Sequence, residues 1–169
     1  MNDVVVTGLG LITPAGIGTA ATWDGLLAGT PTAATDPELA GLPTDFSCRI
    51  PGFDAGVLLG RRRAARLDRF TALAVLAARE AVAAAGLLPA EWAARRVGVV
   101  VGTGTAAMAS YLVEIPKIAD GRHRLVDPFS VPRTVPSMSA AEIGLARRRV
   151  LADGQGEVRR PLAGTPGPG

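Results

Sequence analysis

The segment VVVTGLGLITPAG, residues 4–16, is the stretch that decides how the N-terminal part of the chain folds. Three β-branched residues run into a turn rich in glycine, as at the start of a dinucleotide-binding fold. That fold requires a third glycine three positions after the second, where a helix begins. Thr13 occupies this position and Pro14 follows it, so no helix N-terminus is available for a pyrophosphate. We interpret the segment as a buried strand followed by a tight glycine turn, and we expect no cofactor.

Composition and charge narrow the possible function classes. Hydrophobic residues make up 48% of the chain, which favours a folded domain. Residues 145–169 carry five arginines against Asp153 and Glu157, and this excess of three equals the formal net charge of +3. A basic excess confined to a tail without aromatic residues does not indicate a nucleic-acid partner. The start of the chain lacks the features of a signal peptide, and Cys48 is the only cysteine, so we expect a cytoplasmic protein with no membrane segment and no internal disulfide.

Apolar periodicity predicts an α/β arrangement. Two short apolar runs, 4–6 and 97–101, are typical of strands buried on both faces. The longest helix is expected over 61–85, with a broad apolar surface that favours a central position and with Gly86 as its C-terminal stop. Two such strands separated by a long buried helix indicate an α/β domain with a largely parallel sheet.

Shorter elements are expected on both sides of this helix. The predicted ranges are helices over 22–28, 106–119 and 137–145, a strand over 46–50, a helical turn over 91–95, and loops over 30–45 and 120–136. Thr22 and Ser137 are expected as N-caps, Gly29 as a stop and Pro116 as a helix break.

Six blocks of sequence together resemble one known family. In chain order they read VVVTGLGLITPAG, TWDGLLAG, RIPGFD, RLDRFTALAVLAAREAVAAAGL, RVGVVVGTG and DPFSVPRTVPSMSAAEIGL. Their order and spacing resemble the N-terminal part of β-ketoacyl-acyl-carrier-protein synthases of the elongating type. The resemblance implies the N-terminal half of a thiolase-like α/β fold, with a mostly parallel core sheet and a buried central helix. It divides the chain into a ketosynthase-like half-domain, 1–145, and a tail, 146–169. We expect this tail, which is rich in Arg, Gly and Pro, to be disordered or encoded in a shifted frame.

The resemblance also implies a reaction, the decarboxylative Claisen condensation of acyl and malonyl thioesters in fatty-acid or polyketide synthesis. The family uses a cysteine thiolate as nucleophile, together with two histidines and a lysine. The cysteine would fall near residues 159–162, which read RRPL. Cys48 is interpreted as an inert packing or edge-strand cysteine, and His123 as a solvated loop histidine. No catalytic residue, cofactor site or metal site is therefore predicted, and we expect the chain to be inactive alone.

The resemblance assigns weaker roles to other positions. Thr105, Met108, Thr134 and Val135 match positions that border the acyl pocket or the dimer interface. The expected partners are acyl carrier protein and a second subunit, which is either a copy of this chain or a full-length synthase. Arg61–Arg63 is interpreted as a solvated helix start, with carrier-protein docking as the alternative. Two other functions remain open, a non-catalytic partner of a full-length synthase and a nicotinamide-dependent oxidoreductase. The unpaired apolar surface of a half-fold also predicts poor solubility of the chain alone.

Overall fold

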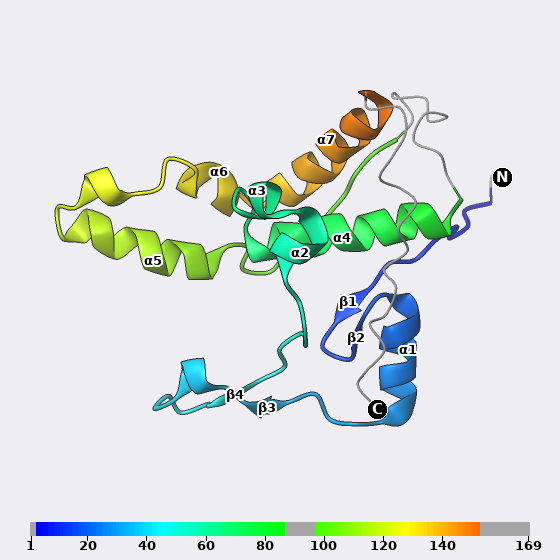
Figure 1. Cartoon of the computed structure of the whole chain (residues 1–169), viewed down its shortest axis with the longest axis horizontal. Helices are drawn as coiled ribbons and strands as arrows, with labels where there is room; N and C mark the ends of the chain where they lie inside the picture. Colours follow the sequence, from blue (N-terminus) through cyan, green and yellow to red (C-terminus); the bar gives the residue numbers. More distant parts are fainter. Residues whose placement is uncertain (1–2, 87–96, 153–169) are drawn as a thin grey trace.

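The computed structural model describes residues 3–86 and 97–152. Most of the ordered elements are helices, and Figure 1 shows α4 running through the middle of the molecule. In chain order the elements are β1 Ile12–Thr13, β2 Gly16–Ile17, α1 Thr19–Ala28, β3 Ala34–Thr35, η1 Pro37–Leu39, β4 Phe46–Ser47, α2 Ala55–Leu59, α3 Arg61–Ala64, α4 Arg69–Ala84, α5 Met108–Ala119, η4 His123–Leu125, α6 Ser130–Thr134 and α7 Met138–Ala152. Among these helices, none has both the length and the apolar content needed to cross a lipid bilayer.

Helix α4 forms the core, as its broad apolar surface predicts. It buries Thr71, Ala72, Val75 and Leu76, and it packs against α7. The prediction of one continuous helix over 61–85 is wrong, because α3 ends at Ala64 and the chain turns before α4 begins.

The two ends of α4 have separate local causes. Asp68 is its N-cap, and the Asp68 carboxylate accepts a hydrogen bond from the backbone N–H of Phe70 at 3.4 Å. A capping side chain of this kind favours a new helix start over continuation of the preceding one. Gly86, with φ of 63°, lies just beyond the C-terminal end as predicted.

The predicted parallel sheet is not present among the described residues. The described strands are two antiparallel pairs of two residues each, β1 with β2 and β3 with β4. Residues 4–6 and 97–101, predicted as buried strands, lie outside these ladders, and the Val4 side chain is 97% exposed. A strand of this kind requires a neighbouring strand for its backbone hydrogen bonds and a covering layer for its side chains. Neither segment finds a strand partner within the described part of the chain, so both predictions are wrong for this structure.

The glycines of the opening segment serve close packing against α4. A Cβ atom placed on Gly8 would lie 2.2 Å from the carbonyl oxygen of Ala81. One placed on Gly10 would lie 2.0 Å from the carbonyl oxygen of Ala77. Only a residue without a side chain fits backbone against backbone at these distances. The interpretation that glycine lets this turn pass through a crowded region is therefore confirmed.

Helix α1 starts earlier than predicted. It begins at Thr19 after Gly18, so Thr22 is not its N-cap. The buried Thr22 hydroxyl instead donates a hydrogen bond to the carbonyl oxygen of Gly16 at 3.0 Å, which ties the helix to β2. The predicted stop is correct, because Gly29 adopts the left-handed conformation with φ of 64°.

The second half of the chain contains more helix than predicted. Pro116 does not break α5, which continues to Ala119, and the Pro116 carbonyl oxygen accepts the N–H of Asp120 at 2.9 Å. The region 120–136, predicted as loop, contains η4 and α6. Helix α7 begins after Ser137 and runs to Ala152. The helical turn predicted over 91–95 and the remainder of the tail, 153–169, lie outside the described residues, so the division at residue 145 stays a prediction.

Candidate functional site

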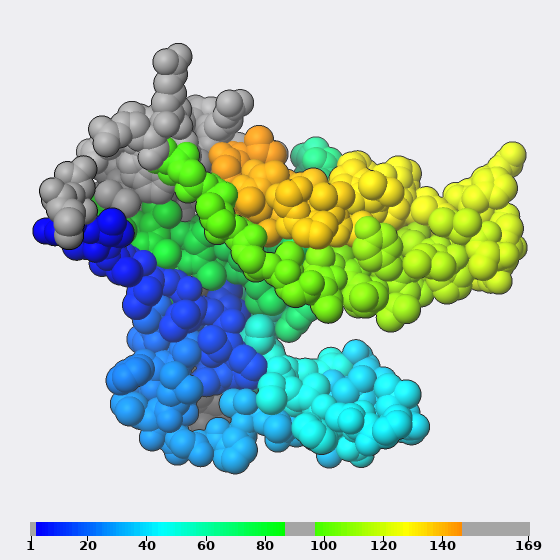
Figure 2. Space-filling model, turned by 180° about the vertical axis from the view of Figure 1, so that it is seen from behind, coloured from blue at the N-terminus to red at the C-terminus, as the bar shows by residue number. Residues whose placement is uncertain are grey.

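Residues 108–134 form a projecting helical hairpin, which we call the arm. Helix α5 leads away from α4, and η4 and α6 return toward it, as the lime and yellow segments of Figures 1 and 2 show. Thr105 and Met108 lie where the chain enters the arm, and both are exposed. Thr134 and Val135 lie where it returns, and the Thr134 side chain is 1% exposed. The four predicted lining residues therefore flank the two ends of the arm.

Helix α5 has an inverted polarity. Ser110, Glu114 and Lys117 share one face because they are four and three residues apart, and this polar face lies inward. The outward face is apolar, and each of the following side chains is more than half exposed: Leu112, Val113, Ile115 and Ile118. An amphipathic helix on a folded domain normally turns its apolar stripe toward the core. The reversed arrangement leaves these apolar side chains of α5 exposed, and exposed apolar patches are a feature of interaction surfaces.

Glu114 is the buried centre of the inward face. Its side chain is 11% exposed, and one carboxylate oxygen lies 2.8 Å from the Lys117 ammonium. The other oxygen accepts a hydrogen bond of 3.1 Å from the backbone N–H of Asp127, on the returning half of the arm. The Lys117 ammonium, and then the hydrogen bond from Asp127, lower the pKa of Glu114 below its ordinary value. Sequence reasoning did not single out Glu114, although its spacing from Ser110 and Lys117 is visible in the sequence.

The arm is fastened at its base by further polar contacts. Ser110 donates a hydrogen bond to the carboxylate of Asp68, which also caps α4. On the returning half, the Arg133 guanidinium pairs with the Asp127 carboxylate at 2.9 Å. The same guanidinium donates to the carbonyl oxygen of Ala65 at 3.5 Å, in the turn after α3. These contacts fix both ends of the arm to the α3–α4 region.

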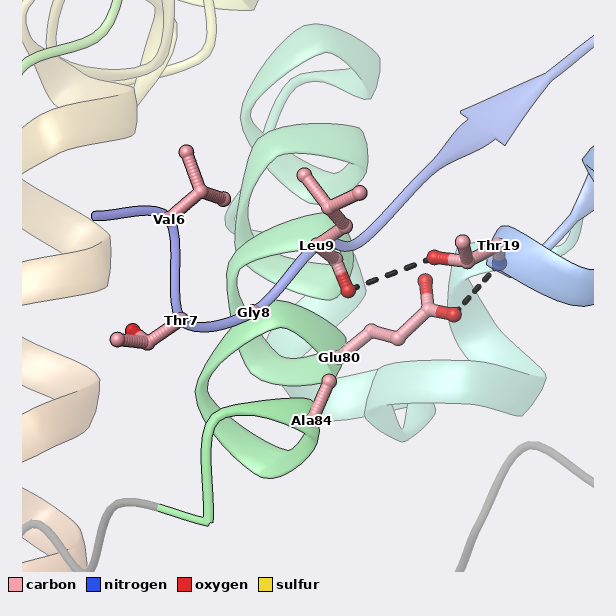
Figure 3. Close-up of a pocket in the computed structure, with 7 residues that line it drawn as sticks. All are labelled: Val6, Thr7, Gly8, Leu9, Thr19, Glu80 and Ala84. Atoms are coloured by element: carbon pink, nitrogen blue, oxygen red, sulfur yellow. Dashed lines mark hydrogen bonds between the residues drawn. The ribbon is translucent and has the colours of Figure 1, made fainter.

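A pocket of about 510 Å³ lies beside the glycine turn. Figure 3 shows its lining residues, Val6, Thr7, Gly8, Leu9, Thr19, Glu80 and Ala84. The Glu80 carboxylate accepts two backbone hydrogen bonds, from Thr19 at 2.6 Å and from Leu11 at 2.9 Å. It therefore occupies the N-terminus of α1, which is where a dinucleotide-binding fold would hold its phosphate. A carboxylate at that place repels a phosphate, so the pocket does not suit a nucleotide.

An acidic and basic cluster supports the β3–β4 hairpin. The Asp36 carboxylate, 5% exposed, accepts hydrogen bonds from Ser47 at 2.6 Å and from Arg49 at 2.6 and 2.7 Å. The Arg49 guanidinium and then the Ser47 hydroxyl lower the pKa of Asp36 to about 2. A second pocket, of about 660 Å³, adjoins Arg49, Phe53 and Arg69, and Arg69 lies 4.7 Å from the Phe53 ring centre. The Arg49 guanidinium is already paired with the carboxylates of Asp36 and Glu38. We therefore interpret this cluster as stabilising the β3–β4 hairpin.

The structure does not gather Cys48 and His123 into a site. Cys48 is a free, exposed thiol just after β4, and no helix begins directly after it. His123 is exposed in η4, at the far end of the arm. Within residues 3–86 and 97–152, no group of three or more His, Cys, Asp or Glu side chains is placed to hold a metal ion.

Comparison with known proteins points to one family. A family model described as the N-terminal domain of β-ketoacyl synthase matches residues 1–147. The 3-oxoacyl-[acyl-carrier-protein] synthase 2 of Staphylococcus aureus (strain COL) is 32% identical over 147 residues, covering 84% of this chain and 35% of that protein. The ketoacyl synthase alpha subunit of the tetracenomycin polyketide synthase from Streptomyces glaucescens is 40% identical over 129 residues, covering 73% of this chain and 30% of that subunit.

A solved structure gives the same result for the fold. The ishigamide ketosynthase/chain length factor superposes with a TM-score of 0.68 at 28% identity, covering 85% of this chain and 41% of the matched chain. This chain spans about a third of the length of the curated relatives that it matches. The likeness covers the N-terminal portion of those proteins, in agreement with the sequence-based resemblance.

Proposed function

Because this chain belongs to the β-ketoacyl synthase family, we propose that it is the N-terminal part of a ketosynthase of fatty-acid or polyketide synthesis. The complete family reaction is the decarboxylative condensation of an acyl and a malonyl thioester. The observation that carries the proposal is the family match across residues 1–147, which includes α4 and the whole arm. In this reading the chain supplies scaffold and pocket wall.

The first part of the proposal is that the 169-residue chain has no condensing activity by itself. Cys48 is its only thiol, and it lies outside any nucleophile turn. The test incubates the purified chain with acyl and malonyl carrier protein and follows the condensed product by mass spectrometry, with an intact ketosynthase alongside. Turnover by the chain would overturn the proposal. A Cys48→Ala variant that abolished such turnover would identify the unexpected nucleophile.

The second part is that Thr105, Met108, Thr134 and Val135 line the acyl pocket or the subunit interface. Their position at the two ends of the arm supports this role. The test uses carrier protein whose acyl chain bears a photoreactive diazirine at its far end, followed by peptide mapping. Cross-links should fall in peptides covering 103–110 and 130–138. Cross-links confined to the β3–β4 hairpin would place the acyl chain elsewhere.

The third part is that the apolar face of α5 pairs with a second ketosynthase-family subunit. The apolar, outward-facing side chains of α5 support this, and so does the name of the tetracenomycin relative, which describes an alpha subunit. We expect the chain to co-purify with a full-length synthase, and Leu112→Glu to abolish the association. Val57→Glu, at an exposed apolar position of α2, is the matched control and should have no effect. A monomeric chain that binds no synthase subunit would contradict the proposal.

The fourth part is that acyl carrier protein is a partner. The name of one relative, 3-oxoacyl-[acyl-carrier-protein] synthase 2, includes this carrier protein, and Arg61 and Arg62 expose positive charge on α3. Binding should weaken as salt rises, because exposed charges are screened. Arg61→Glu should reduce binding to an acidic carrier protein in a fluorescence titration, whereas Arg122→Glu, on the distant end of the arm, should not. Equal effects of the two variants would indicate general charge attraction only.

The nicotinamide-dependent alternative is not favoured. Glu80 places a carboxylate at the N-terminus of α1, which opposes phosphate binding there. Titration with a nicotinamide nucleotide should therefore leave the tryptophan fluorescence unchanged.

A further inference from the structure

We propose that Glu114 and Asp127 are a pair of positioning residues that set how the two halves of the arm lie against each other. Through the arm, the pair fixes the relative placement of Met108 at its entry and Thr134 at its return. The consequence for acyl-chain accommodation rests on the proposed function, whereas the positioning itself depends only on the contacts within the arm.

Asp127 joins the two halves of the arm because each of its polar groups is used. Its N–H donates to Glu114 on α5 at 3.1 Å, and its carbonyl oxygen accepts the N–H of Ser130 at 2.8 Å. Its carboxylate accepts the N–H of Phe129 at 2.8 Å and pairs with Arg133 at 2.9 Å. One residue therefore links α5 to the first turn and to the last turn of α6. A shift at Asp127 moves α6 as a unit, together with Thr134 at its end.

Glu114 is the residue of α5 whose carboxylate contacts the returning half of the arm at this junction. The groups that face its carboxylate are the Lys117 ammonium on its own helix and Asp127 on the return, with Arg133 behind Asp127. A buried carboxylate without such partners would be strongly destabilising. An apolar residue at this position would face the returning half of the arm without a polar contact that fixes how the two halves align. The paired carboxylate instead accepts at two fixed points.

Two further contacts fasten the base of the arm, so the Glu114–Asp127 contact determines where the returning half lies. Ser110, one turn before Glu114, is held by Asp68, and Arg133 is held by Ala65. The base of the arm is fastened to the α3–α4 region at these two points. The Glu114–Asp127 contact is the third point, and it holds the two halves of the arm together. Its loss frees the return segment to rotate about the base, and Thr134 and Val135 move with it.

The test measures amide hydrogen exchange of the full 169-residue chain by mass spectrometry. Glu114→Gln removes the charge and keeps the shape. It should speed exchange in peptides covering 120–135 by roughly threefold to tenfold, because a neutral amide oxygen accepts the Asp127 N–H less strongly than a carboxylate does. Exchange in α4 should stay unchanged. Asp120→Asn, an exposed carboxylate of the same arm that pairs with Arg122, is the matched control and should leave exchange unchanged.

A pH profile separates positioning from a general loss of stability. The folded-state pKa of Glu114 is lowered, so its contribution is complete above the unfolded pKa and is lost as pH falls through the folded value. After correction for intrinsic exchange rates, protection of 120–135 should fall with decreasing pH in the parent. The same fall in protection should be smaller in Glu114→Gln, which no longer carries this carboxylate. Lys117→Met keeps the Asp127 hydrogen bond and removes the counter-charge, so the transition should move to higher pH.

Three results would each overturn the proposal. They are unchanged exchange in Glu114→Gln, equal loosening of α4 and the arm in that variant, and a Lys117→Met transition at the parental pH. If Glu114→Gln does not fold, the Lys117→Met profile still gives the decision. Acyl-probe cross-linking of the same variants addresses the proposed function separately. Altered exchange with unaltered cross-linking would sink the acyl-pocket assignment and leave the positioning pair standing.

Discussion

Replacing Gly10 by alanine is expected to destabilise the chain strongly, because the new Cβ atom has no room. It would lie 2.0 Å from the carbonyl oxygen of Ala77, 2.7 Å from the backbone nitrogen of Ala81 and 2.9 Å from the carbonyl carbon of Ala77. All three are backbone atoms of α4, so no flexible side chain is available to move aside. To bring the Cβ atom from 2.0 Å to 3.0 Å from the oxygen, the turn and the helix must separate by at least 1.0 Å.

The loss in free energy of unfolding can be estimated from the contacts that this separation breaks. Overpacking of a well-packed region costs about 1–3 kcal/mol. The neighbouring Leu11 N–H donates to the Glu80 carboxylate at 2.9 Å, and a further 1 Å would end this hydrogen bond. A hydrogen bond to a charged group contributes about 1.5–3 kcal/mol. The expected loss is therefore about 2.5–6 kcal/mol, a large share of the roughly 5–15 kcal/mol that stabilises a typical domain.

The assay is urea unfolding followed by far-UV circular dichroism, with Gly98→Ala as the matched control. Gly98 also lies in an extended glycine-containing segment, but a Cβ atom there meets nothing within 4 Å. The control should unfold at or slightly above the parental midpoint, since alanine restricts the unfolded chain. Equal midpoints for Gly10→Ala and Gly98→Ala would refute the explanation of the opening glycines by close packing.

Two further changes test the polar anchors. Glu80→Gln should cost about 2 kcal/mol in urea unfolding, because the amide nitrogen would face a backbone N–H of Leu11 or Thr19; parental stability would argue against the anchor. Asp36→Asn should flatten the stability profile between about pH 4 and pH 2, because the lowered pKa of Asp36 means that its contribution is present above the unfolded pKa and is lost as pH falls. An acid profile identical to that of the parent would contradict the role of the Asp36–Arg49 pair.

Local signals in the sequence predicted the helical elements well. Gly29 and Gly86 end α1 and α4 where expected, since left-handed backbone at a helix end is a property of the residue itself. The apolar width of the segment around Val75 correctly predicted a central helix. Errors arose where two local signals compete. Asp68 starts a helix inside a run with helical periodicity, and Pro116 is accommodated inside α5.

Features that depend on distant partners were not predicted correctly. The valine runs at 4–6 and 97–101 have the composition of buried strands, but strand formation requires a neighbour that composition does not supply. The inverted polarity of α5 was also missed, because an apolar stripe looks the same in a sequence whether it faces inward or outward. The lining roles of Met108 and Thr134 came from family resemblance and stay predictions.

On the proposed subunit pairing, the inverted helix makes the stability of the arm depend on protein concentration. With Glu114 inside and Leu112 outside, folding of the isolated arm removes little apolar surface of α5 from water. On the proposed subunit pairing, a hydrophobic contribution from this helix is gained when the partner subunit covers it. Melting temperature should then rise with the concentration of the partner by mass action, and dilution alone should loosen the arm before α4. On the proposed pairing, complex formation adds stability to a helix that the chain already forms.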